Sequence, residues 1–94
     1  MSKAAEKGLQ FREQFKRGGT RIGVTRAHQL KNQEQLSYDV VQRMLRYFKR
    51  HEIDKEAKDF GNDDNPSAGY IAWLLWGGDP GYEWSKKKLQ AEKD

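Results

Sequence analysis

Positively charged side chains recur at helical spacing in the middle of the chain. Arg43, Arg46 and Arg50 are three and four residues apart, so they share one face of a helix, and Gln42 and Lys49 extend it. Guanidinium groups bind phosphate and guanine edges, an amide side chain pairs with adenine, and lysine neutralises phosphate. This pattern predicts a surface for an anionic partner, and duplex DNA is the first candidate.

The helix that must position these cations is predicted over residues 38–51. Ser37 is a suitable N-cap, and Asp39 in the first turn complements the helix dipole. A second stripe on the same helix is apolar: Val40, Val41, Met44, Leu45 and Phe48. We therefore expect the apolar stripe to be buried and the cationic stripe to face solvent.

A helix before this one, capped by Thr20 or Thr25 and ending near residue 31 or 32, is indicated by apolar residues three apart. The two helices resemble a helix-turn-helix, in which the second helix enters the major groove. Arg21 and Arg26 would then add contacts to the DNA backbone. The connector of about five residues exceeds the usual turn of three or four. The alternative is an ordinary solvated helix face.

Large apolar side chains are concentrated in residues 66–84, which hold all three tryptophans and two of the four tyrosines. The mean hydropathy of the whole chain is −1.10, so we expect this segment to supply much of the core. Ser67 would cap a helix that is apolar on every side and ends at Gly77 and Gly78, which predicts a central buried helix. An exposed docking patch or insertion at a membrane surface are the alternatives, and the run is too short to span a bilayer.

The remaining pattern completes a small all-α domain. A first helix is predicted from Ala4 to Lys16, stopped by Gly18 and Gly19, and a fifth from Pro80 to Gln90 with Asp79 as its N-cap. Residues 55–65 are predicted to form a charged surface loop. We expect one compact domain of four or five short helices in residues 1–94, with its packed part at about 8–90 and frayed ends.

Charge is divided unevenly along the chain. The net charge is +4, composed of +8 in residues 1–50 and −4 in residues 51–94. This division favours an anionic partner, or internal pairing of the two halves as the alternative. The chain has no cysteine, which excludes disulfides and cysteine zinc sites, and residues 1–7 do not resemble a signal peptide.

Catalytic and metal-binding patterns are weak. Residues 18–23 lack the lysine and serine of a phosphate loop, and residues 59–65 do not fit the frame of an EF-hand. His28 and His51 are not at a metal-ligand spacing, and no serine lies in a nucleophile elbow. We expect a non-enzymatic protein without metal or cofactor.

Several short sequence motifs resemble those of a known protein family. They are Gly18-Gly19-Thr20, Val41-Gln42-Arg43-Met44, Pro66-Ser67-Ala68-Gly69 and Leu75-Trp76-Gly77-Gly78-Asp79. Over about residues 8–90 the chain resembles a small helical domain common in tailed-phage and prophage proteins, alone or beside head-maturation proteins. The resemblance implies a compact fold, a location in the host cytoplasm or the virion, and phage head proteins as partners. It assigns no role to any residue. Two functions are thus predicted: a DNA-binding module, or a phage structural or assembly module.

Overall fold

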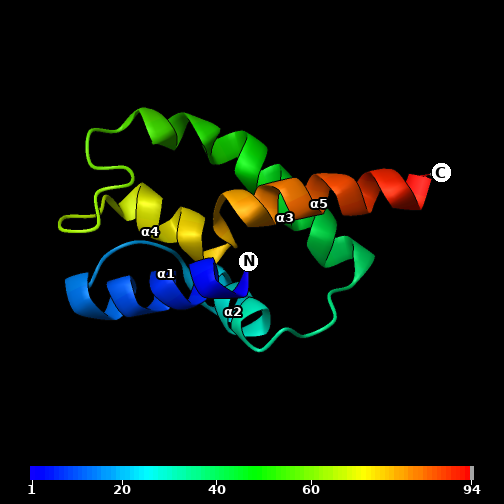
Figure 1. The fold of residues 1–94 in the computed structure, drawn as a ribbon, viewed down its shortest axis with the longest axis horizontal. Helices are drawn as coiled ribbons and strands as arrows, with labels where there is room; N and C mark the ends of the chain where they lie inside the picture. The colour runs from blue at the N-terminus through cyan, green and yellow to red at the C-terminus, as the bar shows by residue number, and fades with distance from the viewer. Residues whose placement is uncertain (94) are drawn as a thin grey trace.

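Five α-helices and one short 3₁₀ helix build the fold in the computed structural model, which describes the backbone of residues 1–93 and the side chains of residues 1–91. The helices are α1 (Ser2–Phe15), α2 (Arg21–Lys31), α3 (Tyr38–His51), η1 (Glu52–Glu56), α4 (Ala68–Leu75) and α5 (Gly78–Lys93), shown in Figure 1. The described residues contain no strand, so the predicted all-α fold is confirmed.

The eight-residue α4 is the centre of the core. It contacts each of the other helices and η1. Its side chains Ile71, Trp73 and Leu75 are at most 2% exposed. The prediction of a central buried helix is therefore confirmed, and it follows from a segment that has no polar face to turn toward water.

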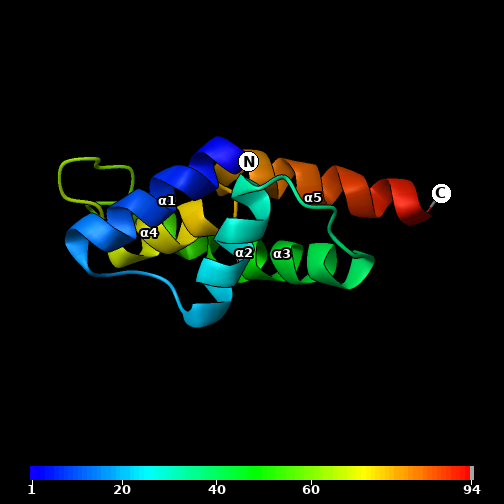
Figure 2. The same ribbon diagram turned by 90° about the horizontal axis from the view of Figure 1, so that it is seen from below.

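The other helices pack in two groups around α4. α1 lies against α4 and α2, and α3 lies against α5. Figure 2 shows α1 and α5 on one side of the molecule and α3 on the other, with the N-terminal end of α2 projecting on the α3 side. The face of α3 that points away from α5 is therefore left open.

Three helix starts agree with the caps expected from the sequence. The hydroxyl oxygens of Thr20, Ser37 and Ser67 accept hydrogen bonds from the backbone N–H groups of Gly23, Val40 and Tyr70, at 3.3, 3.3 and 3.0 Å. Each bond satisfies one of the donors that a helix start leaves unpaired.

Two boundaries differ from the predictions. The chain continues beyond His51 into η1, which the charged sequence of residues 52–56 did not indicate. α5 begins at Gly78, so Asp79 lies inside its first turn and is not the N-cap. The Asp79 carboxylate instead accepts a hydrogen bond from Trp73 Nε1 at 2.9 Å and pairs with Lys55 Nζ at 2.8 Å. Burial opposes its ionisation, but these two partners outweigh burial and hold the pKa of Asp79 below its usual value.

The N-terminal turn also belongs to the packed part of the molecule. Ala5 is fully buried, and Met1 packs against the core cluster. A Cβ atom on Gly8 would lie 2.8 Å from the backbone nitrogen of Leu75, so glycine permits the close approach of α1 to α4. The compact part of the chain therefore starts before residue 8.

Trp73 is the largest fully buried side chain of the core. Replacing it with alanine (Trp73→Ala) is expected to lower the free energy of unfolding by about 3–5 kcal/mol, because a large cavity replaces its packing. Urea melts followed by circular dichroism measure the loss. The half-buried Trp84 is the matched control, and Trp84→Ala should cost less. A loss below about 1 kcal/mol for Trp73→Ala would show that this ring does not support the core.

The glycine at position 18 provides a second test of packing, with Gly61 as its control. Both have positive φ angles, 88° and 85°. A Cβ atom on Gly18 would lie 2.7 Å from Ile71 Cβ, whereas one on Gly61 would meet nothing within 4 Å. Gly61→Ala should therefore cost only the backbone strain of about 1–2 kcal/mol. Gly18→Ala should cost about 1–3 kcal/mol more from overpacking. Equal losses in urea melts would contradict the packing of this corner against α4.

Candidate nucleic-acid interface

Packing of its apolar stripe fixes the orientation of α3. Val41, Met44 and Phe48 are at most 1% exposed. The Phe48 ring stacks on Tyr82 of α5 with centroids 5.1 Å apart, and it meets Trp73 of α4 edge-on at 4.8 Å. The predicted inward stripe is therefore confirmed, and the opposite side of the helix faces solvent.

The outward side of α3 carries a cluster that we call the cationic face: Arg43, Arg46, Lys49 and Arg50, all exposed. Gln42, predicted to join it, is half-buried at its edge. Arg43 Nε pairs with Asp39 Oδ2 at 3.3 Å on the same helix. The other three cations form no ion pair or hydrogen bond within the described part of the chain. An isolated row of like charges of this kind attracts anions.

No carboxylate of the described C-terminal half pairs with the cationic face, and several of these carboxylates are engaged elsewhere. Asp63 pairs with Lys7 at 2.9 Å, Asp79 with Lys55 at 2.8 Å and Glu83 with Lys86 at 3.4 Å. The hydroxyl of Tyr82 donates a hydrogen bond to Glu52 at 3.3 Å. Among the described side chains, the alternative in which acidic residues 51–91 pair with Arg43, Arg46 and Arg50 is therefore not formed.

The two arginines predicted on α2 have different environments. Arg21 is exposed in the first turn, and Figure 2 places that end of α2 on the same side of the molecule as α3. Arg26, in contrast, is only 5% exposed. Its guanidinium lies over the Trp76 ring, 5.3 Å from the centroid, and Nη1 donates a hydrogen bond to Gln29 Oε1 at 2.5 Å. The expectation that Arg26 lies on an exposed face beside Arg21 is wrong, because Trp76 offers its ring as a packing surface.

Burial leaves Arg26 incompletely paired. Its Nε atom is buried without a hydrogen-bond acceptor. Burial lowers the pKa of Arg26, the charge of Arg43 lowers it further, and the charge of Asp39 raises it.

An aromatic column joins α2 to α3 across α4. Trp76, beneath Arg26, stacks on Tyr47 of α3 with centroids 4.5 Å apart and planes 10° from parallel. Tyr47 in turn lies 4.6 Å from the His51 ring. The Tyr47 hydroxyl has no hydrogen-bond partner, and burial together with the charge of Asp54 raises the pKa of Tyr47 above its usual range. The column is a structural link between the two helices.

α2 and α3 do not form a helix-turn-helix. α2 packs against α1 and α4, and α3 packs against α5, α4 and η1, without backbone contact between α2 and α3. The buried side of α2, formed by Gly23, Ala27 and Leu30, faces the other helices. The long connector, residues 32–37, permits this separation. α3 thus presents its cationic face without a supporting helix of the helix-turn-helix type.

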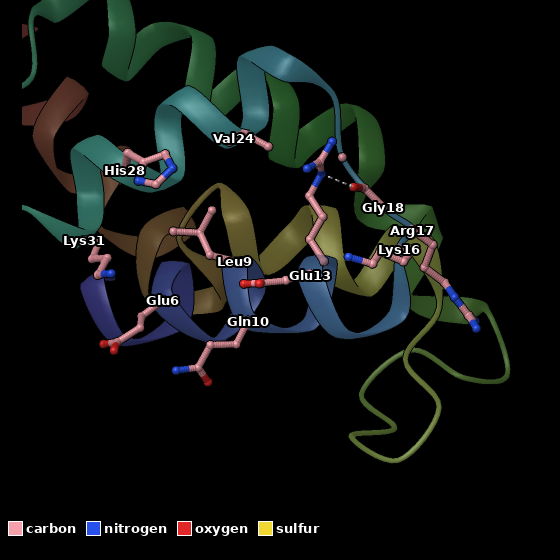
Figure 3. A pocket seen from close by; sticks show the side chains of 12 residues that line it. Glu6, Leu9, Gln10, Glu13, Lys16, Arg17, Gly18, Val24, His28 and Lys31 are labelled. Atoms are coloured by element: carbon pink, nitrogen blue, oxygen red, sulfur yellow. Dashed lines mark hydrogen bonds between the residues drawn. The ribbon is translucent and has the colours of Figure 1, made fainter.

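A groove of about 800 Å³ lies between α1 and α2, away from the predicted site. Figure 3 shows Leu9 of α1 together with Val24 and His28 of α2 along it, and the bond from Arg12 Nε to the Gly18 carbonyl at its end (3.1 Å). Its charged residues have both signs: Glu6, Arg12, Glu13, Lys16, Arg17 and Lys31. Four cations and two carboxylates line the groove, so its lining carries a net positive charge. The spacing of Val24, His28 and Lys31 on one helical face was the signal that could have located it.

A smaller crevice of about 400 Å³ lies between the N-terminus, the α2–α3 connector and α5. Met1, Leu30, Leu36 and Trp84 give it an apolar lining. Trp84 lines this crevice and is half-buried. None of its lining residues belongs to the cationic face.

The described residues contain neither a cluster of metal ligands nor a helix able to span a membrane. No three His, Asp or Glu side chains there are grouped so that they could hold a metal ion. His51 Nδ1 lies 3.2 Å from Asp54 Oδ2, and Asp59 accepts hydrogen bonds from Asn62 and Asn65 at 3.3 Å each. Within that same part of the chain, none of the helices has the length and hydropathy to cross a membrane.

Comparison of the chain with protein-family models, with curated proteins and with solved structures finds no match.

Proposed function

We propose that the chain is a non-enzymatic binding module that binds duplex DNA through the cationic face of α3. The observation that carries the proposal is a row of exposed cations, of which Arg46, Lys49 and Arg50 have no partner in the described residues. A row of unpaired cations on a rigid helix releases counterions from DNA when it binds, and this release supplies the free energy of non-specific association.

The shape of α3 suits a DNA groove. Its 14 residues span about 21 Å, and the major groove admits an α-helix. Arg46 lies at the centre of the outward face, where an arginine can reach guanine. Lys49 and Arg50, further along the helix, are placed for phosphates. Gln42, at the edge of the face, offers an amide for an adenine.

α2 adds a second point of contact. Arg21 is exposed at the helix start, where unpaired N–H groups and the helix dipole favour a phosphate. This end of α2 projects on the same side as α3 (Figure 2). A duplex seated on α3 would therefore meet Arg21 at its backbone.

Reversing two charges on the cationic face tests the proposal. The wild-type chain is expected to bind a duplex of about 20 base pairs with a Kd in the micromolar range at about 50 mM salt. Arg43→Glu combined with Arg46→Glu should weaken binding at least about tenfold and reduce the dependence of log Kd on log salt. Fluorescence anisotropy at several salt concentrations measures both quantities.

The matched control is Lys3→Glu combined with Lys87→Glu, which has the same net charge. Both lysines are exposed, on α1 and α5, and neither belongs to the cationic face of α3. This control should retain most of the affinity, and urea melts should show that both double variants remain folded. Equal affinity of the two double variants would remove the cationic face from the proposal.

A phage structural or assembly module is the second candidate. In its favour are two isoleucines that the fold leaves in solvent, Ile22 at 56% and Ile53 at 69% exposed. Exposed apolar side chains beside charged ones are common where proteins dock. Formation of a stable complex with purified phage head proteins, lost in Ile22→Asp or Ile53→Asp, would support this function over DNA binding.

A further inference from the structure

The most exposed large apolar side chain among the described residues lies on η1. This side chain is Ile53, which is 69% exposed. Three carboxylate residues accompany it on the same short helix: Glu52, Asp54 and Glu56. None of the three pairs with a lysine or arginine in the described part of the chain, and the one cation of η1, Lys55, is already paired with Asp79 at 2.8 Å. η1 thus presents an apolar side chain with negative charge around it.

The groove between α1 and α2 has the complementary composition. Leu9 and Val24 are the apolar part of its lining, and its volume is about 800 Å³. Two of its cations, Lys16 and Lys31, are exposed, and their side chains form no ion pair or hydrogen bond within the described residues. Figure 3 shows these two lysines toward opposite ends of the groove, with Leu9 between them. The lining as a whole is net positive, although it includes two carboxylates.

The two surfaces do not meet within one molecule. η1 packs against α3 and α4 and makes no backbone contact with α1 or α2. Figure 1 shows α1 and α2 along the lower edge of the view and the chain that follows α3 along the upper edge, with α4 between them. Their opposite charges are therefore left for a second copy of the chain.

We propose that the chain associates with itself head to tail, with Ile53 of one copy seated in the α1–α2 groove of the next. Ile53 would bury its side chain against Leu9 and Val24, and the carboxylates around it would lie near the groove lysines. A contact between two different surfaces leaves one groove and one η1 open in every pair, so the assembly grows or closes into a ring. The inference goes beyond DNA binding and uses no residue of the cationic face.

The contact is small, so the association should be weak and sensitive to salt. Contact through η1 alone falls short of the roughly 1,000 Å² that a stable interface buries. We therefore expect a dissociation constant on the order of 100 μM at about 50 mM salt. It should rise at least about fivefold at about 500 mM salt, because salt screens exposed charges.

Sedimentation velocity at increasing protein concentration tests the association. The weight-average mass of the wild-type chain should rise above the monomer mass of 11.0 kDa. Ile53→Asp should keep the chain monomeric. Ile22→Asp is the matched control, because Ile22 is also exposed, at 56%, but lies outside both surfaces. A wild-type chain that stays monomeric, or equal losses in the two variants, would overturn the proposal.

Mixing two variants tests the head-to-tail geometry. Lys16→Glu combined with Lys31→Glu reverses two charges of the groove and leaves η1 intact, whereas Ile53→Asp leaves the groove intact. Each variant alone should be monomeric, with urea melts showing that it is folded. Their mixture should form a dimer of twice the 11.0 kDa monomer mass that grows no further. A mixture that stays monomeric, or a lysine variant that associates as the wild type does, would remove the groove from the contact.

Discussion

Burial of α4 is the constraint on which the rest of the structure depends. A chain with a mean hydropathy of −1.10 has few large apolar side chains, and most of them lie on this eight-residue helix or beside it. Every other helix reaches the core by touching α4. The positions of Trp73 and Trp76 therefore determine where α3 and α2 lie, and with them the positions of the surface charges.

The placement of α2 relative to α3 follows from this constraint, because each of them packs against α4. The two helices make no backbone contact, yet Arg26, Trp76 and Tyr47 form a stack that connects them. Stacking of a guanidinium and two rings combines apolar burial with electrostatic attraction. The connection is thus made through a third element, in contrast to the direct packing of a helix-turn-helix.

Much of the fold could be predicted from local patterns. The stripe of Val41, Met44 and Phe48 is periodic, and the threonine and serine caps act within a few residues, so α3 and three helix starts were correctly predicted. The exposure of Arg43, Arg46 and Arg50 followed from the same periodicity.

What could not be predicted depends on partners distant in sequence. Arginine is normally exposed, and Arg26 is buried because Trp76, far along the chain, covers it. Asp79 resembles an N-cap by its position before proline, but Lys55 and Trp73 engage its carboxylate. The groove between α1 and α2 likewise exists only once the two helices are packed.

The stack across α4 links a buried ring to the arrangement of the charges on the surface. α2 and α3 both pack against α4, and Trp76 contacts both Arg26 of α2 and Tyr47 of α3. The position of the Trp76 ring therefore sets the separation between Arg21 and the cations of α3. A substitution at this ring would change that separation while every charged side chain stayed in the sequence.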